Sequence, residues 1–209
     1  MGRNLLDRKD SKLILEETVH AGFFRMVRLH LQHRLFRGGW SETLEREVVL
    51  HGRVGAMVPY DPKTDMVVLL EQFRNGKFAA GDQQPWSISI AAGMIEDGED
   101  PEQMARREML EETGCEVGRI EEVMTFYSMP GGSSQRMTIF CAEVSADSAT
   151  GFHGLPEEGE DIRVFSEPYS RCKDMLENNQ FDNAATIIGL EWLGRNRERL
   201  RKILSLIHI

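Results

Sequence analysis

The chain has 209 residues, of which 41% are hydrophobic and 28% are charged, a balance typical of a soluble globular protein. Its net charge of −9 at pH 7 argues against binding to the phosphate backbone of a nucleic acid. Three scattered cysteines predict neither a disulfide framework nor a cysteine zinc site. Because no apolar run has the length of a membrane span or a signal peptide, we expect a cytoplasmic protein without a membrane partner.

The N-terminal residues carry patterns that are typical of β-strands. Alternating or β-rich segments predict strands at 12–18, 22–35 and 42–52, and a turn in "FRGGW" joins the last two. Residues 1–50 are therefore expected to form a small antiparallel β subdomain. A unit of this size is too small to bury a core of its own and needs something to pack on.

Residues 51–209 are expected to form a second, larger domain. Strands are predicted at 53–60, 66–74, 87–93, 119–129 and 136–144, and loops at 75–86, 130–135 and 149–161. Helices are predicted at 101–113, 168–178 and 183–204. Strands with a few interspersed helices favour a mixed α+β sandwich.

The helix at 101–113 has clear signals at both of its ends. Asp100 is a good N-cap residue, and Pro101 suits the first helical position. Gly114 fits the position just past the helix, where a left-handed backbone conformation is common. The boundaries of this helix therefore follow from its sequence.

Three glutamates crowd near the end of this helix. Glu108, Glu111 and Glu112 share one face, at positions i, i+3 and i+4. Each solvated pair of like charges costs about 0.2–0.5 kcal/mol, and the helix dipole disfavours negative charge at this end. One interpretation is a solvated acidic face paired with Arg106 and Arg107. The other is a site for a divalent cation, because hard oxygen ligands select Mg²⁺ or Mn²⁺.

The wider stretch has fixed residues at fixed distances. They are Gly93, Glu99, Arg107, Glu108, Met109, Glu111, Glu112, Gly114 and Cys115. This pattern resembles the signature of the Nudix hydrolases at every fixed position. The resemblance implies an α/β/α sandwich with a mixed sheet, and a site that binds Mg²⁺, or Mn²⁺, as two or three ions beside a substrate diphosphate.

The resemblance also implies roles for individual residues. Glu108, Glu112 and the backbone carbonyl of Ala92 would bind the metal. Glu111 would lie close by in the catalytic site, and Arg107 would orient the glutamates. Glu99 is a further candidate for that orienting role.

A second acidic segment, "LPEEGEDIRV", lies in the loop predicted at 149–161. A surface loop rich in Glu and Gly often has no role in chemistry. Aligned on "EDIRV", however, the resemblance places the catalytic base on Glu158 and an added metal ligand on Glu160. The neighbouring Glu157 is the alternative position for the base.

A proline at position 130, sixteen residues after Gly114, resembles the ADP-ribose pyrophosphatase branch of this family. Segments such as "HRLFRGG", "LLEQFR", "GFHG" and "DNAATIIGLEWL" extend the likeness over most of the chain. This likeness implies hydrolysis of ADP-ribose to AMP and ribose 5-phosphate, by a homodimer that exchanges its N-terminal subdomains. Alternatives are another nucleotide sugar such as GDP-mannose, or a regulator that binds nucleotides without turnover.

Substrate contacts are also implied by the resemblance. Arg46 and Arg74 would bind the diphosphate, because an arginine offers a fork of donors to such an anion. Phe23, from the partner chain, would stack on the adenine. Pro130 and Gly131 are the remaining candidates for substrate binding, and Gln135 stands where related enzymes can carry an acidic residue.

Overall fold

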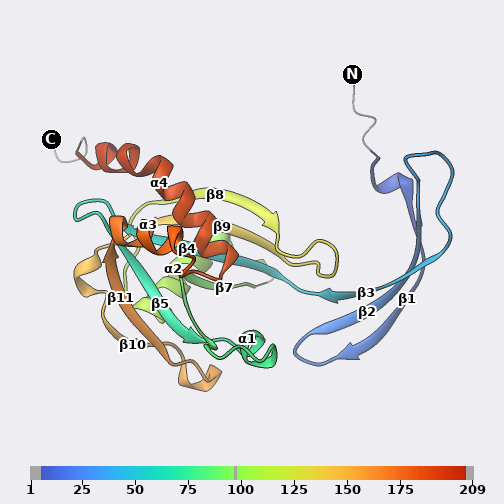
Figure 1. Cartoon of the computed structure of the whole chain (residues 1–209), viewed down its shortest axis with the longest axis horizontal. Helices are drawn as coiled ribbons and strands as arrows, with labels where there is room; N and C mark the ends of the chain where they lie inside the picture. The colour runs from blue at the N-terminus through green and yellow to red at the C-terminus, as the bar shows by residue number, and fades with distance from the viewer. Residues whose placement is uncertain (1–5, 97, 206–209) are drawn as a thin grey trace. The chain divides into compact units, whose positions relative to one another are not determined.

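A computed structural model describes residues 6–96 and 98–205 (Figure 1). The chain divides into two compact units. The first comprises the residues up to Gly52 together with Tyr127–Arg136, and the second comprises Arg53–Phe126 and the residues from Met137 onwards. Each unit is described by itself.

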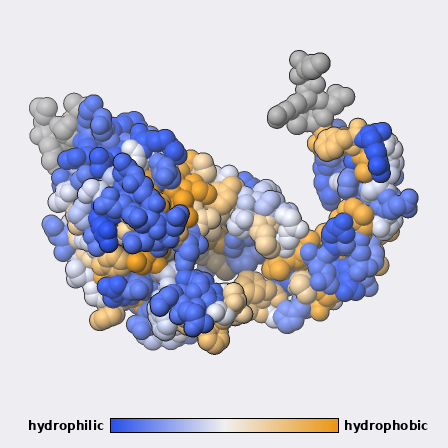
Figure 2. Space-filling model, viewed as in Figure 1, coloured by the Kyte–Doolittle hydropathy of each residue, from blue (hydrophilic) through white to orange (hydrophobic). Residues whose placement is uncertain are grey.

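The first unit contains the predicted antiparallel sheet, which is drawn in blue to teal in Figure 1. After a short 3₁₀ helix, η1 (Arg8–Asp10), the strands are β1 (Ser11–Ala21), β2 (Arg25–His33) and β3 (Leu44–Leu50), in the order β1-β2-β3. Val27 of β2 is fully buried, whereas Leu13, Ile14 and Leu15 of β1 are 48%, 55% and 49% exposed. Orange hydrophobic residues accordingly lie at the surface of this unit in Figure 2.

The segment Tyr127–Arg136 belongs to the first unit because it pairs with the end of β3. The backbone N–H of Val49 donates to the carbonyl of Gly132 at 2.9 Å, and the N–H of Ser134 donates to the carbonyl of Val49 at 3.0 Å. The His51 N–H donates to the Ser134 hydroxyl at 2.8 Å. These bonds fix the loop that carries Pro130 and Gly131 onto the N-terminal sheet.

The second unit is built on a mixed sheet, as the sequence predicts. Its strands are β4 (Arg53–Asp61), β5 (Met66–Phe73), β6 (Trp86–Ser89), β7 (Ala91–Ile95), β8 (Ile120–Tyr127), β9 (Arg136–Glu143), β10 (Gly151–His153) and β11 (Ile162–Pro168). The order is β10-β11-β5-β4-β9-β8, while β6 pairs with β5 and β7 pairs with β4. The arrangement is visible in Figure 1.

Helices complete this unit. They are α1 (Asn75–Ala79), α2 (Pro101–Thr113), α3 (Tyr169–Glu177) and α4 (Ala184–Ser205), with 3₁₀ helices η2 (Ala146–Ser148) and η3 (Pro156–Glu158). The predicted helices at 101–113, 168–178 and 183–204 are thereby confirmed. None of the helices within the described residues has the length and apolarity needed to cross a membrane.

Two hydrophobic clusters make the unit a sandwich. One cluster joins α3 and α4 to the sheet, through residues such as Tyr169, Cys172, Leu190 and Leu193. The other joins α2 to the sheet through Met104, Ala105 and Met109. Helix α2 lies so close to β4 that a Cβ added at Gly55 would come within 1.9 Å of Met104 Cε. Helix α2 is therefore packed tightly against the sheet.

Several local predictions were wrong. The predicted strand 87–93 is two strands, because the N–H of Ile90 donates to the Thr186 hydroxyl at 3.1 Å and the segment changes partner from β5 to β4 there. The predicted loop 75–86 contains α1, and the predicted loop 149–161 contains β10 and η3. Residues 22–24, predicted as strand, form the turn between β1 and β2.

Candidate active site

Helix α2 presents the glutamates as its sequence predicts. The Asp100 carboxylate accepts hydrogen bonds from the N–H groups of Glu102 and Gln103, at 2.9 and 3.3 Å. Gly114 ends the helix in the left-handed conformation, with a φ of 68°. Met104, Ala105 and Met109 are fully buried. The glutamate face therefore lies at the border of the core.

Glu112 is the most deeply placed of the three glutamates. Its side chain is 5% exposed, and one carboxylate oxygen accepts a hydrogen bond from the N–H of Ala92 at 3.0 Å. Burial raises the pKa of Glu112 to about 8; the bond from Ala92 opposes this rise, and the charges of Glu108 and Glu160 add to it. A buried carboxylate with so little compensation is electrostatically suited to a cation.

Arg107 lies at the centre of the other carboxylates. Its guanidinium donates to Glu108 at 2.8 Å, to Glu111 at 3.3 Å and to Glu99 at 3.3 Å. It also donates to the carbonyl of Met94 at 3.3 Å. One arginine thus holds three glutamates that would otherwise repel each other. The proposed orienting roles of Arg107 and Glu99 are compatible with these contacts.

Gly93 has a geometric reason to be glycine. A Cβ added there would lie 1.9 Å from the carboxyl carbon of Glu108. The Glu108 carboxylate therefore rests against the backbone of β7, in space that any side chain would fill. Burial raises the pKa of Glu108, and Arg107 partly offsets that rise.

The acidic loop after β10 lies next to the end of α2. The N–H of Gly154 donates to the backbone carbonyl of Glu111 at 3.2 Å. Glu160 is half-buried, accepts a hydrogen bond from the N–H of Leu155 at 3.2 Å, and acts electrostatically on Glu108 and Glu112. Glu157 and Glu158 are both exposed in η3. Glu160 is thus close to the helix glutamates, while the two candidate bases face solvent.

Arg74 belongs to the same unit and precedes α1. Its guanidinium donates to the hydroxyl of Ser89 at 2.9 Å, and its charge opposes the rise in the pKa of Glu112. Arg74 also lines a cavity of about 380 Å³ together with Trp86, Glu158 and Glu160. A predicted diphosphate ligand, a predicted base and a predicted metal ligand therefore share one cavity.

The other four candidates for substrate binding lie in the first unit. Phe23 is 88% exposed at the β1–β2 turn and meets Phe24 edge to face, with ring centroids 4.8 Å apart. Arg46 lies exposed on β3 and donates to the carbonyl of Glu45 at 2.7 Å. Pro130 and Gly131 are exposed in the loop between β8 and β9.

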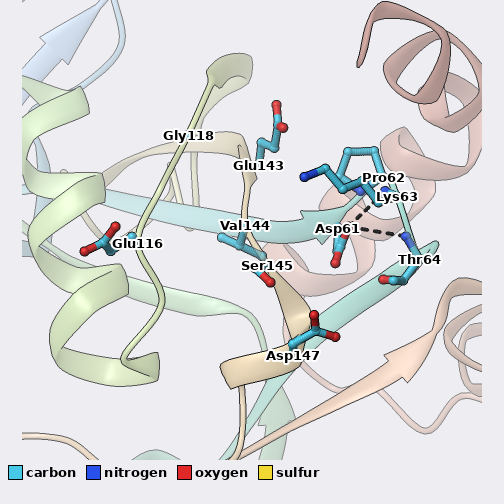
Figure 3. A pocket seen from close by; sticks show the side chains of 10 residues that line it. All are labelled: Asp61, Pro62, Lys63, Thr64, Glu116, Gly118, Glu143, Val144, Ser145 and Asp147. Carbon is cyan, nitrogen blue, oxygen red and sulfur yellow. Dashed lines mark hydrogen bonds between the residues drawn. The ribbon is translucent and has the colours of Figure 1, made fainter. Parts of the chain in front are cut away.

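A separate cavity of about 270 Å³ lies beside the β4–β5 turn (Figure 3). The carboxylate of Asp61, on its wall, accepts hydrogen bonds from the N–H groups of Lys63, Thr64 and Ala146, at 2.9, 3.3 and 3.1 Å. The sequence-predicted site residues do not line this cavity within the described part of the chain. Asp61 thus has a structural role, in holding the turn to η2.

In residues 6–96 and 98–205, no three histidine, cysteine, aspartate or glutamate side chains converge in a geometry that would hold a metal ion. The signature carboxylates do not converge because they have other partners: Glu108 and Glu111 contact Arg107, and Glu112 accepts a hydrogen bond from the N–H of Ala92. A cation would have to draw these oxygens together.

Sequence reasoning missed two groups of residues around this site. Ser89 is the partner of Arg74, and a serine in a short strand gives no signal of its own. Phe73 lies near the end of a predicted strand, and Phe78 and Trp86 lie within the predicted loop 75–86. Three aromatic residues within fourteen positions were the available signal.

The chain is similar to known proteins over much of its length. The family model described as "NUDIX domain" matches residues 49–180. The ADP-ribose pyrophosphatase of Escherichia coli (strain K12) is 40% identical over 194 residues, which span 93% of this chain and 92% of the relative. The GDP-mannose pyrophosphatase of Escherichia coli (strain SMS-3-5 / SECEC) is 34% identical over 149 residues, which span 71% and 77%.

A solved structure described as "Crystal structure of ADP compounds hydrolase" superposes with a TM-score of 0.68 over 90% of this chain and 97% of the other. Its sequence identity is 21%, so this likeness concerns the fold alone. The family model covers more than half of the chain and includes the whole glutamate signature. The chain therefore belongs to the Nudix hydrolase family.

Proposed function

We propose that the chain hydrolyses ADP-ribose to AMP and ribose 5-phosphate in the presence of Mg²⁺. The observation that carries this proposal is the 40% identity to an ADP-ribose pyrophosphatase, which extends over 92% of that relative. A likeness of that extent includes the N-terminal sheet as well as the Nudix domain. The chain would thus be a nucleoside diphosphate-sugar hydrolase with two domains, residues 1–50 and residues 51–209.

The residues of the second unit fit a hard divalent cation. Glu112 is a buried carboxylate whose pKa is raised to about 8 by burial, and a bound cation would favour its ionised form. Glu108 and Glu160 bring further carboxylate oxygens near it, and Mg²⁺ prefers such ligands. When bound, the cation would neutralise charge on the diphosphate.

The carbonyl of Ala92 is a fourth proposed ligand. The N–H of Ala92 points to Glu112 and not to β4, although Ala92 stands opposite Ala56 in the β4–β7 pair. In an antiparallel pair, the N–H and C=O of one residue point to the same side. The carbonyl of Ala92 therefore points toward the α2 side of β7, which supports its place in the ligand set.

Glu158 is the proposed general base. It is exposed in η3, at the cavity that Arg74 and Glu160 also line. Its carboxylate would accept the proton of the attacking water, while Arg74 binds the diphosphate through charge-assisted hydrogen bonds. Arg107 would keep Glu111 and Glu108 in place as the substrate binds.

Four residues of the first unit complete the proposal. Phe23 would stack on the adenine, and Arg46 would bind phosphate, both from the N-terminal sheet of a partner chain in a homodimer. Pro130 and Gly131 lie in a loop that is hydrogen-bonded to β3 of its own chain.

The experiment is a panel of nucleotide sugars incubated with Mg²⁺ and the purified chain, with products identified by mass. ADP-ribose should be the best substrate by kcat/KM, and AMP and ribose 5-phosphate should be its products. The second candidate is GDP-mannose, favoured by the relative that is 34% identical over 71% of the chain. A regulator without turnover is disfavoured, because Glu108, Glu111 and Glu112 are all present.

A further inference from the structure

Three aromatic rings stand together beside the proposed catalytic loop. Phe73 ends β5 and is the cross-strand partner of Trp86 in β6. Their ring centroids are 5.2 Å apart at an angle of 74°, and Phe78 of α1 lies 5.7 Å from Phe73. These side chains are 38%, 55% and 67% exposed for Phe73, Trp86 and Phe78. Rings of this size are normally buried, so three exposed ones in contact need an explanation.

The segment that carries these rings is held rigidly. The N–H of Arg74 donates to the carbonyl of Pro85 at 2.8 Å and closes the loop between β5 and β6. Asp182 accepts hydrogen bonds from the Lys77 ammonium and, at 3.2 Å, from the Ser87 hydroxyl. The loop is therefore tied at both ends and in its middle. The aromatic rings form a fixed platform, which suits a ligand that must be positioned.

Two of these rings, Phe73 and Trp86, line the cavity of about 380 Å³ that contains Arg74. Phe73 and Trp86 give it apolar surface, and Glu158 and Asp161 of the acidic loop add carboxylates to its lining. Such a pocket combines an apolar surface with a few polar groups, as small-molecule sites do. The occupant must therefore offer both an apolar face and hydrogen-bond donors.

A sugar ring meets both requirements. Its C–H face packs on an aromatic ring, and its hydroxyls donate to carboxylates such as Asp161 or to the amide oxygen of Asn75, both of which line the cavity. A diphosphate held by Arg74 has two linked groups, and one of them would extend into this cavity. Because Arg74 and the cation would hold the diphosphate itself, the neutral sugar linked to it is the group that would reach Phe73 and Trp86.

We propose that the pocket of Phe73, Asn75, Trp86 and Asp161 binds the sugar at the non-nucleoside end of the diphosphate, with Trp86 packed against the face of the sugar ring. For ADP-ribose this sugar is the terminal ribose. The proposal rests on the proposed function, and it assigns the choice between sugars to the β5–β6 segment. Trp86 is then a specificity-determining residue.

The test compares Trp86→Ala and Trp86→Phe with wild type, using the full-length protein and Mg²⁺. The two products serve as separate probes, because ribose 5-phosphate contains the sugar and AMP contains the nucleoside. Trp86→Ala should weaken inhibition by ribose 5-phosphate about three- to tenfold, the loss expected for one aromatic contact. Inhibition by AMP should stay within about twofold of wild type. Trp86→Phe should keep most of the affinity for ribose 5-phosphate.

The matched control is Phe152→Ala, which removes another aromatic side chain of the same unit that is 78% exposed. It should leave inhibition by both products unchanged. The proposal is overturned if Trp86→Ala weakens inhibition by AMP as much as inhibition by ribose 5-phosphate. It is also overturned if neither inhibition changes.

A second measurement keeps this test independent of turnover. The tryptophans are replaced by 5-fluorotryptophan, and the fluorine signal of Trp86 is assigned by its loss in Trp86→Phe. Ribose 5-phosphate should shift that signal, and AMP should not. A signal that ribose 5-phosphate does not move overturns the pocket assignment. A wild-type protein that shows the shift but does not hydrolyse ADP-ribose overturns only the proposed function.

Discussion

At the scale of single residues, Glu112 is the site carboxylate whose pKa is raised most strongly by burial. It is 5% exposed, and burial raises its pKa to about 8 in the metal-free chain. An unfolded glutamate titrates near about 4.3. Between these values the folded state holds a proton that the unfolded state releases. The contribution of Glu112 to the stability of the metal-free protein should therefore be greatest below the lower pKa and fall as the pH rises toward 8.

Glu112→Gln should remove the fall in stability that Glu112 causes as the pH rises, because glutamine has no proton to lose and fits the same space. Urea unfolding from pH 5 to 8.5 in the presence of a chelator measures the effect. The variant should gain stability over wild type as the pH rises. Mg²⁺ should stabilise the wild type more at high pH than at low pH, and should stabilise the variant less. Parallel pH profiles for the two proteins would contradict the assignment.

Glu158→Gln should separate chemistry from binding. Removal of a general base costs about 10²–10⁴-fold in rate, while the α2 glutamates and Arg74 remain in place. The kcat for ADP-ribose at saturating Mg²⁺ should fall by that factor, and the substrate affinity should change little. A higher pH should partly restore the rate, because hydroxide becomes available.

Glu157→Gln is the control for this variant, since both glutamates are exposed in the same turn of η3. It should behave nearly as wild type. A large loss in Glu157→Gln with a small one in Glu158→Gln would move the base by one residue. Losses below about tenfold in both, short of the range for a general base, would place the base among the glutamates of α2.

Gly93→Ala should displace the Glu108 carboxylate. The new Cβ would come within 1.9 Å of the Glu108 carboxyl carbon, and the flexible side chain can yield where the backbone cannot. We expect a large loss of activity and weaker Mg²⁺ binding, with a small change in Tm. Gly118→Ala is the control, because its Cβ would make only ordinary contacts, the nearest at 3.5 Å. Equal activity in the two variants would show that the position of Glu108 does not matter.

At the scale of elements, Asp61 holds the β4–β5 turn to η2. Burial alone would raise its pKa, but the hydrogen bonds from Ala146, Thr64 and Lys63 outweigh burial and lower it. A lowered pKa in the folded state adds stability above the unfolded value of about 3.9, and this stability is lost as the pH falls through the folded value. Asp61→Asn should therefore be less stable than wild type at pH 7 and should lose less stability on acidification.

Thermal unfolding between pH 3 and 7 measures this difference. Asp147→Asn, at another carboxylate on the wall of the same cavity (Figure 3), is the control and should follow the wild-type profile. If Asp61→Asn and wild type have the same acid dependence, the hydrogen bonds to Asp61 do not couple to its ionisation.

The elements that the sequence predicted correctly are those with local signals. Helix α2 has an N-cap at Asp100, a C-terminal Gly114 and a periodic apolar face, so its bounds could be read directly. The division of 87–93 into β6 and β7 could not, because it depends on the hydroxyl of Thr186, almost a hundred residues away. Helix α1 has five residues and no side-chain cap at its start, so tertiary contacts through Lys77 and Asp182 stabilise it.

The candidate site likewise contains features with a local sequence signal and features that depend on side-chain orientation or distant contacts. The fixed spacing of the glutamate signature indicated which carboxylates share a face of α2. It did not indicate that Arg107 holds Glu99, Glu108 and Glu111 together, since that depends on side-chain orientation. The aromatic platform went unpredicted because Phe73 and Trp86 become neighbours only through the pairing of β5 with β6.

At the scale of the whole molecule, the N-terminal sheet leaves much of its apolar surface exposed. Leu13, Ile14 and Leu15 are about half exposed, and Phe36 is 95% exposed. Exposed apolar surface of this kind is characteristic of an interface with another protein. A homodimer would bury it, and the proposed site would then receive Phe23 and Arg46 from the partner chain.

The dimer can be tested with the full-length protein. Ile14→Asp places a charge on the apolar part of β1 and should shift the chain from dimer toward monomer in light scattering, with a loss of ADP-ribose hydrolysis. Glu16→Asp changes a nearby residue of the same strand without changing its charge and should keep both the dimer and the activity. Deletion of residues 1–50 should cause aggregation or loss of activity, because it removes the proposed adenine contact. A monomeric Ile14→Asp variant with full activity would refute the contribution of the partner chain, since a site completed in trans must fail when the dimer dissociates.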